Sequence, residues 1–270
     1  MKYELIDSGD GKKLEDFGPY RLIRPCGHAF WPISHPKEWE TIHATFSREG
    51  KKHWTGNFPE TWNIEMLDLK FKISPTDFGH LGIFPEHEQA WKWIQHMNLE
   101  NSKVLNLFAY SGGASLMAAK QGAQVCHLDA SPGMVKWARD NAKLNELEKA
   151  PIRWIVDDVM KFLKREIKRE SLYEGLIVDP PSFGRGNKGE VFKIEEEIIP
   201  LLMHCRKVLS KKPKFVFFSC HTPSFSPKVM HHLLELMMKG KGGHIESGEM
   251  LIPSKKSREL PMGCYARWSP

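Results

Sequence analysis

The pattern of hydrophobic and polar positions changes near residue 95. Before that point, short apolar runs such as residues 20–23 and 66–71 stand between turn residues, which is typical of β-strands. Six of the nine tryptophans fall in this part of the chain, and we interpret them as core side chains rather than as a base-stacking platform. Residues 1–95 are therefore predicted to form a small, mostly β N-terminal domain, a candidate for substrate binding.

From residue 96 onward, strand-like and helix-like segments alternate. This alternation predicts an α/β fold, in which a doubly wound, mostly parallel seven-stranded sheet carries helices on both faces within residues 96–270. The predicted strands are 104–108, 125–128, 152–156, 176–178, 215–218 and two short runs near 244–251 and 264–268. The predicted helices are 113–121, 131–147, 191–209 and one that ends at Gly240.

Composition adds few constraints. Of the 270 residues, 41% are hydrophobic and 27% charged, as in ordinary globular proteins. We expect a cytoplasmic protein, because no apolar run is long enough to span a bilayer and the first residues lack a signal peptide. The five cysteines show no zinc or redox spacing, so we expect free thiols and no metal site.

The net charge of +6 slightly favours an anionic partner. Short basic clusters supply it, and the alternative is that they are only a solvated surface. The clusters are Lys51-Lys52, residues 161–169, residues 211–214 and residues 255–258.

Candidate binding residues stand at the carboxyl ends of the predicted strands, where open parallel sheets bind ligands. Gly112 and Gly113 follow the first strand and allow a close approach of the backbone to a ligand. Asp129 ends the second strand, where a carboxylate can accept hydrogen bonds from two ribose hydroxyls. Asp157 and Asp158 follow the third, where a carboxylate can hold an adenine amino group. Each acid is equally able to cap a helix, but their recurrence at successive strand ends favours nucleotide binding.

The fourth strand is followed by Asp179-Pro180-Pro181-Ser182-Phe183. Proline cannot continue a sheet ladder and drives the preceding residue into an extended conformation, so the backbone is stiff where it leaves the sheet. A stiff, polar turn suits gripping the edge of a base or an amine, whereas a simple strand stop rarely needs this sequence. Asp179 is thus a candidate catalytic residue, with Phe183 as a stacking face.

These motifs resemble those of a known family. Residues 106–113 resemble the nucleotide-binding motif of bacterial methyltransferases that modify large-subunit ribosomal RNA, and residues 179–183 resemble their signature after the fourth strand. Residues 82–87 resemble the motif before the sheet that lies against the methionine end of the cofactor. The chain is most similar to a branch without a separate N-terminal RNA-binding domain, from about residue 3 to residue 268.

The resemblance implies a class I methyltransferase of Rossmann-like fold, with S-adenosyl-L-methionine as cofactor and a base in RNA, ribosomal RNA above all, as acceptor. It implies that Asp129 binds the ribose, Asp158 the adenine and residues 106–113 the methionine part. His87 stands where relatives usually carry Gln. The cofactor-binding residues predicted in this way are Phe84, Pro85, Glu86, Asn106, Phe108, Tyr110, Ser111, Gly112, Gly113, Asp129, Ala130, Ser131, Asp157, Asp158, Val159 and Asp179.

Cys220 introduces a second chemical route. In pyrimidine carbon-5 methyltransferases a thiolate attacks carbon-6 and makes carbon-5 nucleophilic, and part of the resembling family keeps this cysteine at the end of the fifth strand. Here the setting is Ser219-Cys220-His221, and adjacent strand residues point to opposite faces, so His221 need not reach the sulfur. In the alternative, Asp179 and the adjoining backbone position an amino or ring nitrogen for direct transfer. We expect the direct route.

Two other classes of protein share features of this sequence. A nicotinamide-dependent oxidoreductase would normally carry Gly-x-Gly-x-x-Gly, whereas only Gly112-Gly113 is present. A non-catalytic RNA-binding protein on the same fold would be expected to lose the strand-end acids, which are all retained.

Overall fold

The computed structural model describes residues 1–50, 53–185, 189 and 191–270. These residues form two compact units: a first unit of Met1–Gln89 with Leu251–Met262, and a second unit of Ala90–Met250 with Gly263–Pro270. The predicted basic pair Lys51-Lys52 lies outside the described residues. None of the helices in the described part of the chain combines the length and the apolar character that crossing a bilayer requires.

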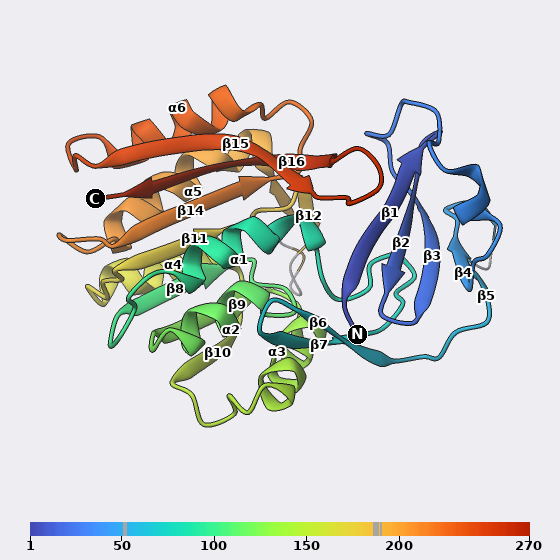
Figure 1. The fold of residues 1–270 in the computed structure, drawn as a ribbon. Coiled ribbons are helices and arrows are strands. Elements are labelled where there is room, and N and C mark those ends of the chain that lie inside the picture. The colour runs from blue at the N-terminus through green and yellow to red at the C-terminus, as the bar shows by residue number, and fades with distance from the viewer. Residues whose placement is uncertain (51–52, 186–188, 190) are drawn as a thin grey trace. The chain divides into compact units, whose positions relative to one another are not determined.

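A five-stranded sheet of order β1-β2-β3-β4-β5 forms most of the first unit (Figure 1). The same unit contains a separate hairpin of β6 and β7, so the predicted mostly β character of this part is confirmed. The elements are β1 (Tyr3–Gly9), β2 (Lys12–Phe17), β3 (Tyr20–Pro25), η1 (Pro36–Trp39), β4 (Ala44–Phe46), β5 (Trp54–Gly56), β6 (Trp62–Met66), β7 (Leu69–Ile73) and η2 (Pro85–His87).

The prediction of one strand over residues 66–71 is wrong, because this run contains the turn of the β6–β7 hairpin. Met66 pairs with Leu69, and Leu67 between them has a φ of 53°. An L-residue rarely adopts this left-handed conformation, and a leucine gives no sequence signal for it.

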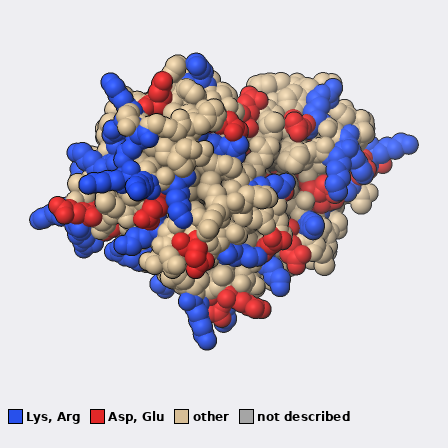
Figure 2. Space-filling view, turned by 60° about the vertical axis from the view of Figure 1, so that its left-hand side comes forward, with Lys and Arg blue, Asp and Glu red and all other residues tan. Residues whose placement is uncertain are grey.

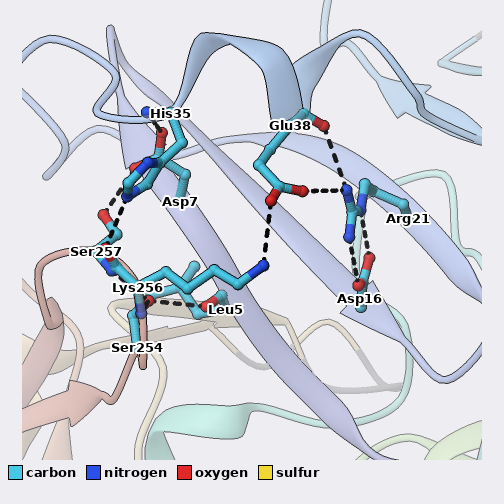
Figure 3. A network of polar contacts seen from close by, with 9 residues as sticks. All are labelled: Leu5, Asp7, Asp16, Arg21, His35, Glu38, Ser254, Lys256 and Ser257. Atoms are coloured by element: carbon cyan, nitrogen blue, oxygen red, sulfur yellow. Dashed lines mark hydrogen bonds and ion pairs between the residues drawn. The ribbon is translucent and has the colours of Figure 1, made fainter.

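Asp7 of β1 joins two loops in the first unit. Its buried carboxylate accepts hydrogen bonds from the backbone N–H of Ser34 (2.9 Å) and from the indole N–H of Trp39 (3.0 Å). It also accepts a hydrogen bond from the hydroxyl of Ser257 (2.7 Å), which Figure 3 shows. The segment Leu251–Met262 is thereby fixed to the N-terminal strands of the same unit.

An ion-pair chain runs beside this contact. Lys256 pairs with Glu38 at 3.1 Å, Glu38 pairs with Arg21 at 2.7 Å, and Arg21 also pairs with Asp16 at 2.8 Å (Figure 3). Lys256 is therefore partly neutralised by its neighbours.

The second unit contains the seven-stranded sheet, of order β10-β9-β8-β11-β14-β16-β15 (Figure 1). Strands β8 to β11 and β14 run parallel, and β16 pairs antiparallel with β14. The predicted doubly wound, mostly parallel sheet is confirmed, and its order reverses between β8 and β11. The strands are β8 (Lys103–Leu107), β9 (Gln124–Asp129), β10 (Ile152–Val156), β11 (Gly175–Val178), β14 (Phe215–Cys220), β15 (His244–Ile252) and β16 (Leu260–Ser269).

Helices cover both faces of this sheet, as the alternation predicts. Side chains of α4, α5 and α6 share a buried apolar cluster with Val216 and Phe218 of β14. On the opposite face, Trp93 of α1 packs edge-on against Phe215 and contacts Phe217. The remaining elements are α1 (Glu88–Gln95), α2 (Gly113–Lys120), α3 (Pro132–Leu144), α4 (Val159–Lys168), α5 (Ile194–Val208), α6 (Pro227–Met238), β12 (Phe183–Arg185) and β13 (Val191–Lys193).

Candidate functional site

The chain leaves β8 through a strained turn of residues 108–113, here called the glycine turn. Phe108, Tyr110 and Gly112 have positive φ values of 57°, 50° and 94°. Such a conformation costs a non-glycine residue about 1–3 kcal/mol, and strain of this kind clusters at ligand sites. The turn lies beside the point between β8 and β11 where the strand order reverses, which is where open α/β sheets bind ligands.

Both glycines of the turn are also required by packing inside the second unit. A Cβ on Gly113 would lie well under 3.0 Å from the indole of Trp91, and a Cβ on Gly112 would lie 3.0 Å from that of Ala138. The glycine pair therefore has a structural reason besides any ligand, since it lets α1 and α3 pack closely against the turn.

A buried polar chain lies under the glycine turn. The amide of Asn106 donates to the hydroxyl of Ser115 (2.9 Å), which lies 2.9 Å from Nδ1 of His127. Burial lowers the pKa of His127 to about 3, so the ring is neutral and packs against Trp154 with 4.8 Å between ring centroids. Asn106 is thus buried and links β8 to α2, so its predicted contact with the cofactor stays a prediction.

Asp129 holds the glycine turn from the end of β9. Its carboxylate accepts the backbone N–H of Tyr110 (2.9 Å) and of Ser131 (2.8 Å), one on each oxygen. Burial raises the pKa of Asp129, and these two hydrogen bonds partly offset the rise. Ser131 caps α3 through its own hydroxyl, so the cap does not require Asp129. Each carboxylate oxygen of Asp129 has two lone pairs and accepts one of these two hydrogen bonds, so each can still accept a hydrogen bond from a ligand.

Asp157 and Asp158 take up local roles at the start of α4. Asp158 is the N-cap and accepts the backbone N–H of Lys161 at 2.8 Å. Asp157 accepts the N–H of Asp158 (2.9 Å) and pairs with Arg165. Capping by Asp158 is therefore observed, and binding of an adenine amino group by its second oxygen stays a prediction.

The register of β11 and β14 places Asp179 beside Ser219. Ile177 pairs with Phe217 and Val178 with Phe218, so Asp179 and Ser219 each follow the last pair of the ladder. The hydroxyl of Ser219 donates to Oδ1 of Asp179 at 2.7 Å, and Nε2 of His221 lies 3.7 Å from the same oxygen. Residues 179, 219 and 221 thus gather on one face of the sheet.

Cys220 points to the other face. Its side chain is 1% exposed, belongs to the apolar cluster under α5 and α6, and accepts the backbone N–H of Thr222 at 3.4 Å. Burial raises the pKa of the Cys220 thiol. A buried thiol with a raised pKa is a poor source of the thiolate that covalent catalysis needs.

Phe183 presents an exposed ring beyond the Asp-Pro-Pro sequence. Its side chain is 52% exposed, and its backbone pairs with Lys193 in the short β12–β13 hairpin. The hydroxyls of Ser182 and Thr222 lie 2.6 Å apart. This contact connects the segments that follow β11 and β14, as the hydrogen bond between Ser219 and Asp179 also does. The ring of Phe183 is open to solvent on part of its surface, and its role as a stacking face stays a prediction.

Three of the predicted cofactor-binding residues lie in the first unit. Phe84 precedes η2 and is half-buried, while Pro85, Glu86 and the neighbouring His87 are buried within it. Ala130 and Val159 lie in the second unit, directly after β9 and at the start of α4. Ser111 is buried there, and its carbonyl accepts the side-chain amide of Asn141 at 2.9 Å.

The sequence interpretation missed four polar residues of the second unit. Strand alternation places Ser219 on the face of Asp179 only once β14 is paired with β11, and Thr222 lies beyond the end of β14, so the sequence alone carried no signal for either. Ser115 and His127 lie within a helix and a strand, where only the tertiary structure shows that they meet under the glycine turn.

Three features define a class I, nucleotide-binding methyltransferase fold: the strand order of the sheet, the glycine turn after β8 and the carboxylate of Asp129 at the end of β9. The model of the S-adenosylmethionine-dependent methyltransferase family matches residues 28–215, and the chain belongs to this family. S-adenosylmethionine is therefore its cofactor, as predicted. The glycine turn and the remaining acceptor capacity of Asp129 fit the binding of this molecule.

The most informative relatives agree with this assignment. The solved structure of the SAM-dependent methyltransferase from Agrobacterium tumefaciens is 39% identical, has a TM-score of 0.94 and covers 100% of this chain and 91% of its own. Ribosomal RNA large subunit methyltransferase K/L is 31% identical over 159 residues in Pseudoalteromonas translucida (58% of this chain, 22% of that protein). In Pseudoalteromonas atlantica it is 32% identical over 186 residues (67% and 26%). The chain spans about a quarter of the length of these curated relatives.

Proposed function

We propose that this methyltransferase transfers the methyl group of S-adenosylmethionine to a base in RNA, and to ribosomal RNA in particular. The proposal is supported by the Pseudoalteromonas relatives, which are named as methyltransferases of large-subunit ribosomal RNA. An RNA acceptor would place the enzyme in the cytoplasm. The family assignment leaves the nicotinamide-dependent alternative without support.

The second unit supplies most of the proposed cofactor contacts. Asp129 would accept the ribose hydroxyls, the second oxygen of Asp158 the adenine amino group, and the glycine turn would face the methionine part. Asp129 suits this role because its two oxygens are already oriented by the backbone N–H groups of Tyr110 and Ser131. A preoriented acceptor loses little conformational freedom on binding.

The single observation that carries the proposed chemistry is the placement of Asp179. Asp179 directly follows β11 and precedes Pro180 and Pro181. Because these prolines lack N–H groups, the backbone here offers carbonyl acceptors. These hydrogen-bond acceptors suit a base nitrogen that carries a hydrogen. The exposed ring of Phe183 would provide a stacking face for the same base.

We infer direct transfer from this geometry. The lone pair of the acceptor nitrogen would attack the methyl carbon of S-adenosylmethionine as the carbon–sulfur bond breaks. S-adenosylhomocysteine would leave, and the nitrogen would release its proton to solvent. In-line approach needs the nitrogen to be held close to the methyl group, and holding it is the task assigned to Asp179. No covalent enzyme intermediate is required, which agrees with the burial of Cys220.

Surface charge favours a polyanionic acceptor. In the face shown in Figure 2, Lys and Arg side chains gather over much of the left-hand part, with acidic side chains between them, and the net charge is +6. Cationic clusters bind phosphates without sequence preference and speed the encounter with RNA.

Labelled methyl transfer tests the proposed function. The protein is incubated with methyl-labelled S-adenosylmethionine and, separately, with ribosomal RNA from a strain that lacks the gene, with other RNA, and with free nucleosides. We expect label in ribosomal RNA above the other two acceptors. Equal label in free nucleosides, or label only in protein, would contradict an RNA acceptor.

A further inference from the structure

Ser219 is a polar residue in an otherwise apolar strand. It follows Phe215-Val216-Phe217-Phe218 in β14, and its side chain is 0% exposed. Burying a hydroxyl destabilises the fold unless the hydroxyl is hydrogen-bonded. Here the Ser219 hydroxyl donates its one hydrogen to Oδ1 of Asp179 at 2.7 Å. The strand therefore carries a serine at the position that follows the last β11–β14 pair, where its hydroxyl reaches Asp179.

This hydrogen bond restricts the rotation of the Asp179 carboxylate about its Cβ–Cγ bond. A hydroxyl that donates to Oδ1 helps to set where Oδ2 points, and Nε2 of His221 lies 3.7 Å from the same oxygen. Cys220, the next residue along the strand, has no such role, because strand alternation turns it into the apolar cluster on the other face.

We propose that Ser219 is the positioning residue for methyl transfer: it orients Asp179 so that the carboxylate accepts the N–H of the acceptor base. The inference rests on the proposed role of Asp179 in the acceptor site. Ser219 does not touch the reacting atoms in this scheme, and it acts through Asp179.

The test compares Ser219→Ala with Ser210→Ala, a control that removes a buried serine hydroxyl elsewhere in the second unit. In Ser219→Ala we expect kcat to fall about 10- to 100-fold, as for the loss of one hydrogen bond to a charged group, with an unchanged Kd for S-adenosylmethionine. Ser219→Thr keeps the hydroxyl and should recover most of the turnover, and Ser210→Ala should keep all of it.

Non-additivity separates positioning from a general structural effect. In an Asp179→Ala background, Ser219→Ala should lower kcat no further, because the group it orients is gone. Wild-type turnover in Ser219→Ala, or equal losses in both backgrounds, would overturn the proposal.

A crystal structure of Ser219→Ala gives a second readout that needs no acceptor. We expect the Asp179 carboxylate to be rotated or disordered, and a carboxylate in its wild-type position would contradict the proposal. If wild-type protein methylates no RNA, the proposed function fails, whereas this structural comparison still decides the role of Ser219.

Discussion

Trp91 lies so close to Gly113 that the glycine has no room for a Cβ: the added atom would lie well under 3.0 Å from the indole. Gly113→Ala should therefore destabilise the protein by about 1–3 kcal/mol through overpacking. Gly133→Ala is the matched control, since its Cβ would meet only Ser131 Oγ at 3.7 Å, and it should stabilise α3 by up to about 1 kcal/mol. Urea unfolding midpoints measure both, and equal effects of the two substitutions would refute the packing argument.

Asp129→Ala should weaken S-adenosylmethionine binding, because hydrogen bonds to a charged group contribute about 1.5–3 kcal/mol each. We expect the Kd from calorimetry to rise at least about tenfold, and Glu148→Ala, an exposed acid after α3, should leave it unchanged. Since burial raises the pKa of Asp129, wild-type affinity should fall as the pH drops through that raised value and the carboxylate is protonated. A folded Asp129→Ala protein with wild-type affinity would rule out the ribose assignment.

Asp7 should make the first unit sensitive to acid. Burial alone would raise the pKa of Asp7, but hydrogen bonds from Trp39, Ser257 and two backbone N–H groups outweigh it and lower the pKa. A lowered folded-state pKa adds stability that is present above the unfolded value of about 3.9 and is lost as the pH falls through the folded-state value.

Asp7→Asn removes this contribution and leaves buried donors poorly paired. The substitution should lower the free energy of unfolding at pH 7 by about 1–3 kcal/mol. It should also make the free energy of unfolding decrease less steeply as the pH falls below 4. The exposed Asp10 provides the control, because asparagine tolerates its left-handed φ of 50° and Asp10→Asn should change neither quantity. Denaturant titrations at several pH values check both, and an unchanged acid slope in Asp7→Asn would contradict the assignment.

RNA affinity should fall as salt rises, because contacts with phosphates release counterions, with a slope of roughly 0.7 per contact for single strands. Lys161 and Lys164 lie in the first turns of α4, next to Asp158, and both are exposed. Their joint replacement by Gln should reduce the slope measured by fluorescence anisotropy. Lys211 and Lys212 precede β14, at the end away from Ser219, so their replacement should matter less. If the RNA affinity of the wild-type protein did not change with salt concentration, a polynucleotide acceptor would be contradicted.

The sequence predicted the sheet well because several strands are apolar runs followed by a polar residue, as in 125–128 and 176–178, which aspartates follow. It failed at Leu67, where a leucine occupies a left-handed turn that no propensity signals. At the site, it indicated Asp129 and Asp179 because each ends a strand. It did not indicate Ser219, since the pairing of β14 with β11 is a tertiary fact. It also could not show that Gly113 is required by Trp91, a residue of another helix.

The central claim is direct methyl transfer at Asp179, and turnover of two single variants tests it most directly. Initial rates of label transfer from S-adenosylmethionine to ribosomal RNA are measured for wild type, Cys220→Ala and Asp179→Ala, with cofactor binding checked for each. We predict that Cys220→Ala keeps most of the activity and that Asp179→Ala, measured at saturating cofactor, loses about two to three orders of magnitude in turnover. An inactive Cys220→Ala that still binds cofactor, together with a denaturation-resistant adduct between wild-type protein and RNA that contains 5-fluorocytosine, would contradict the claim.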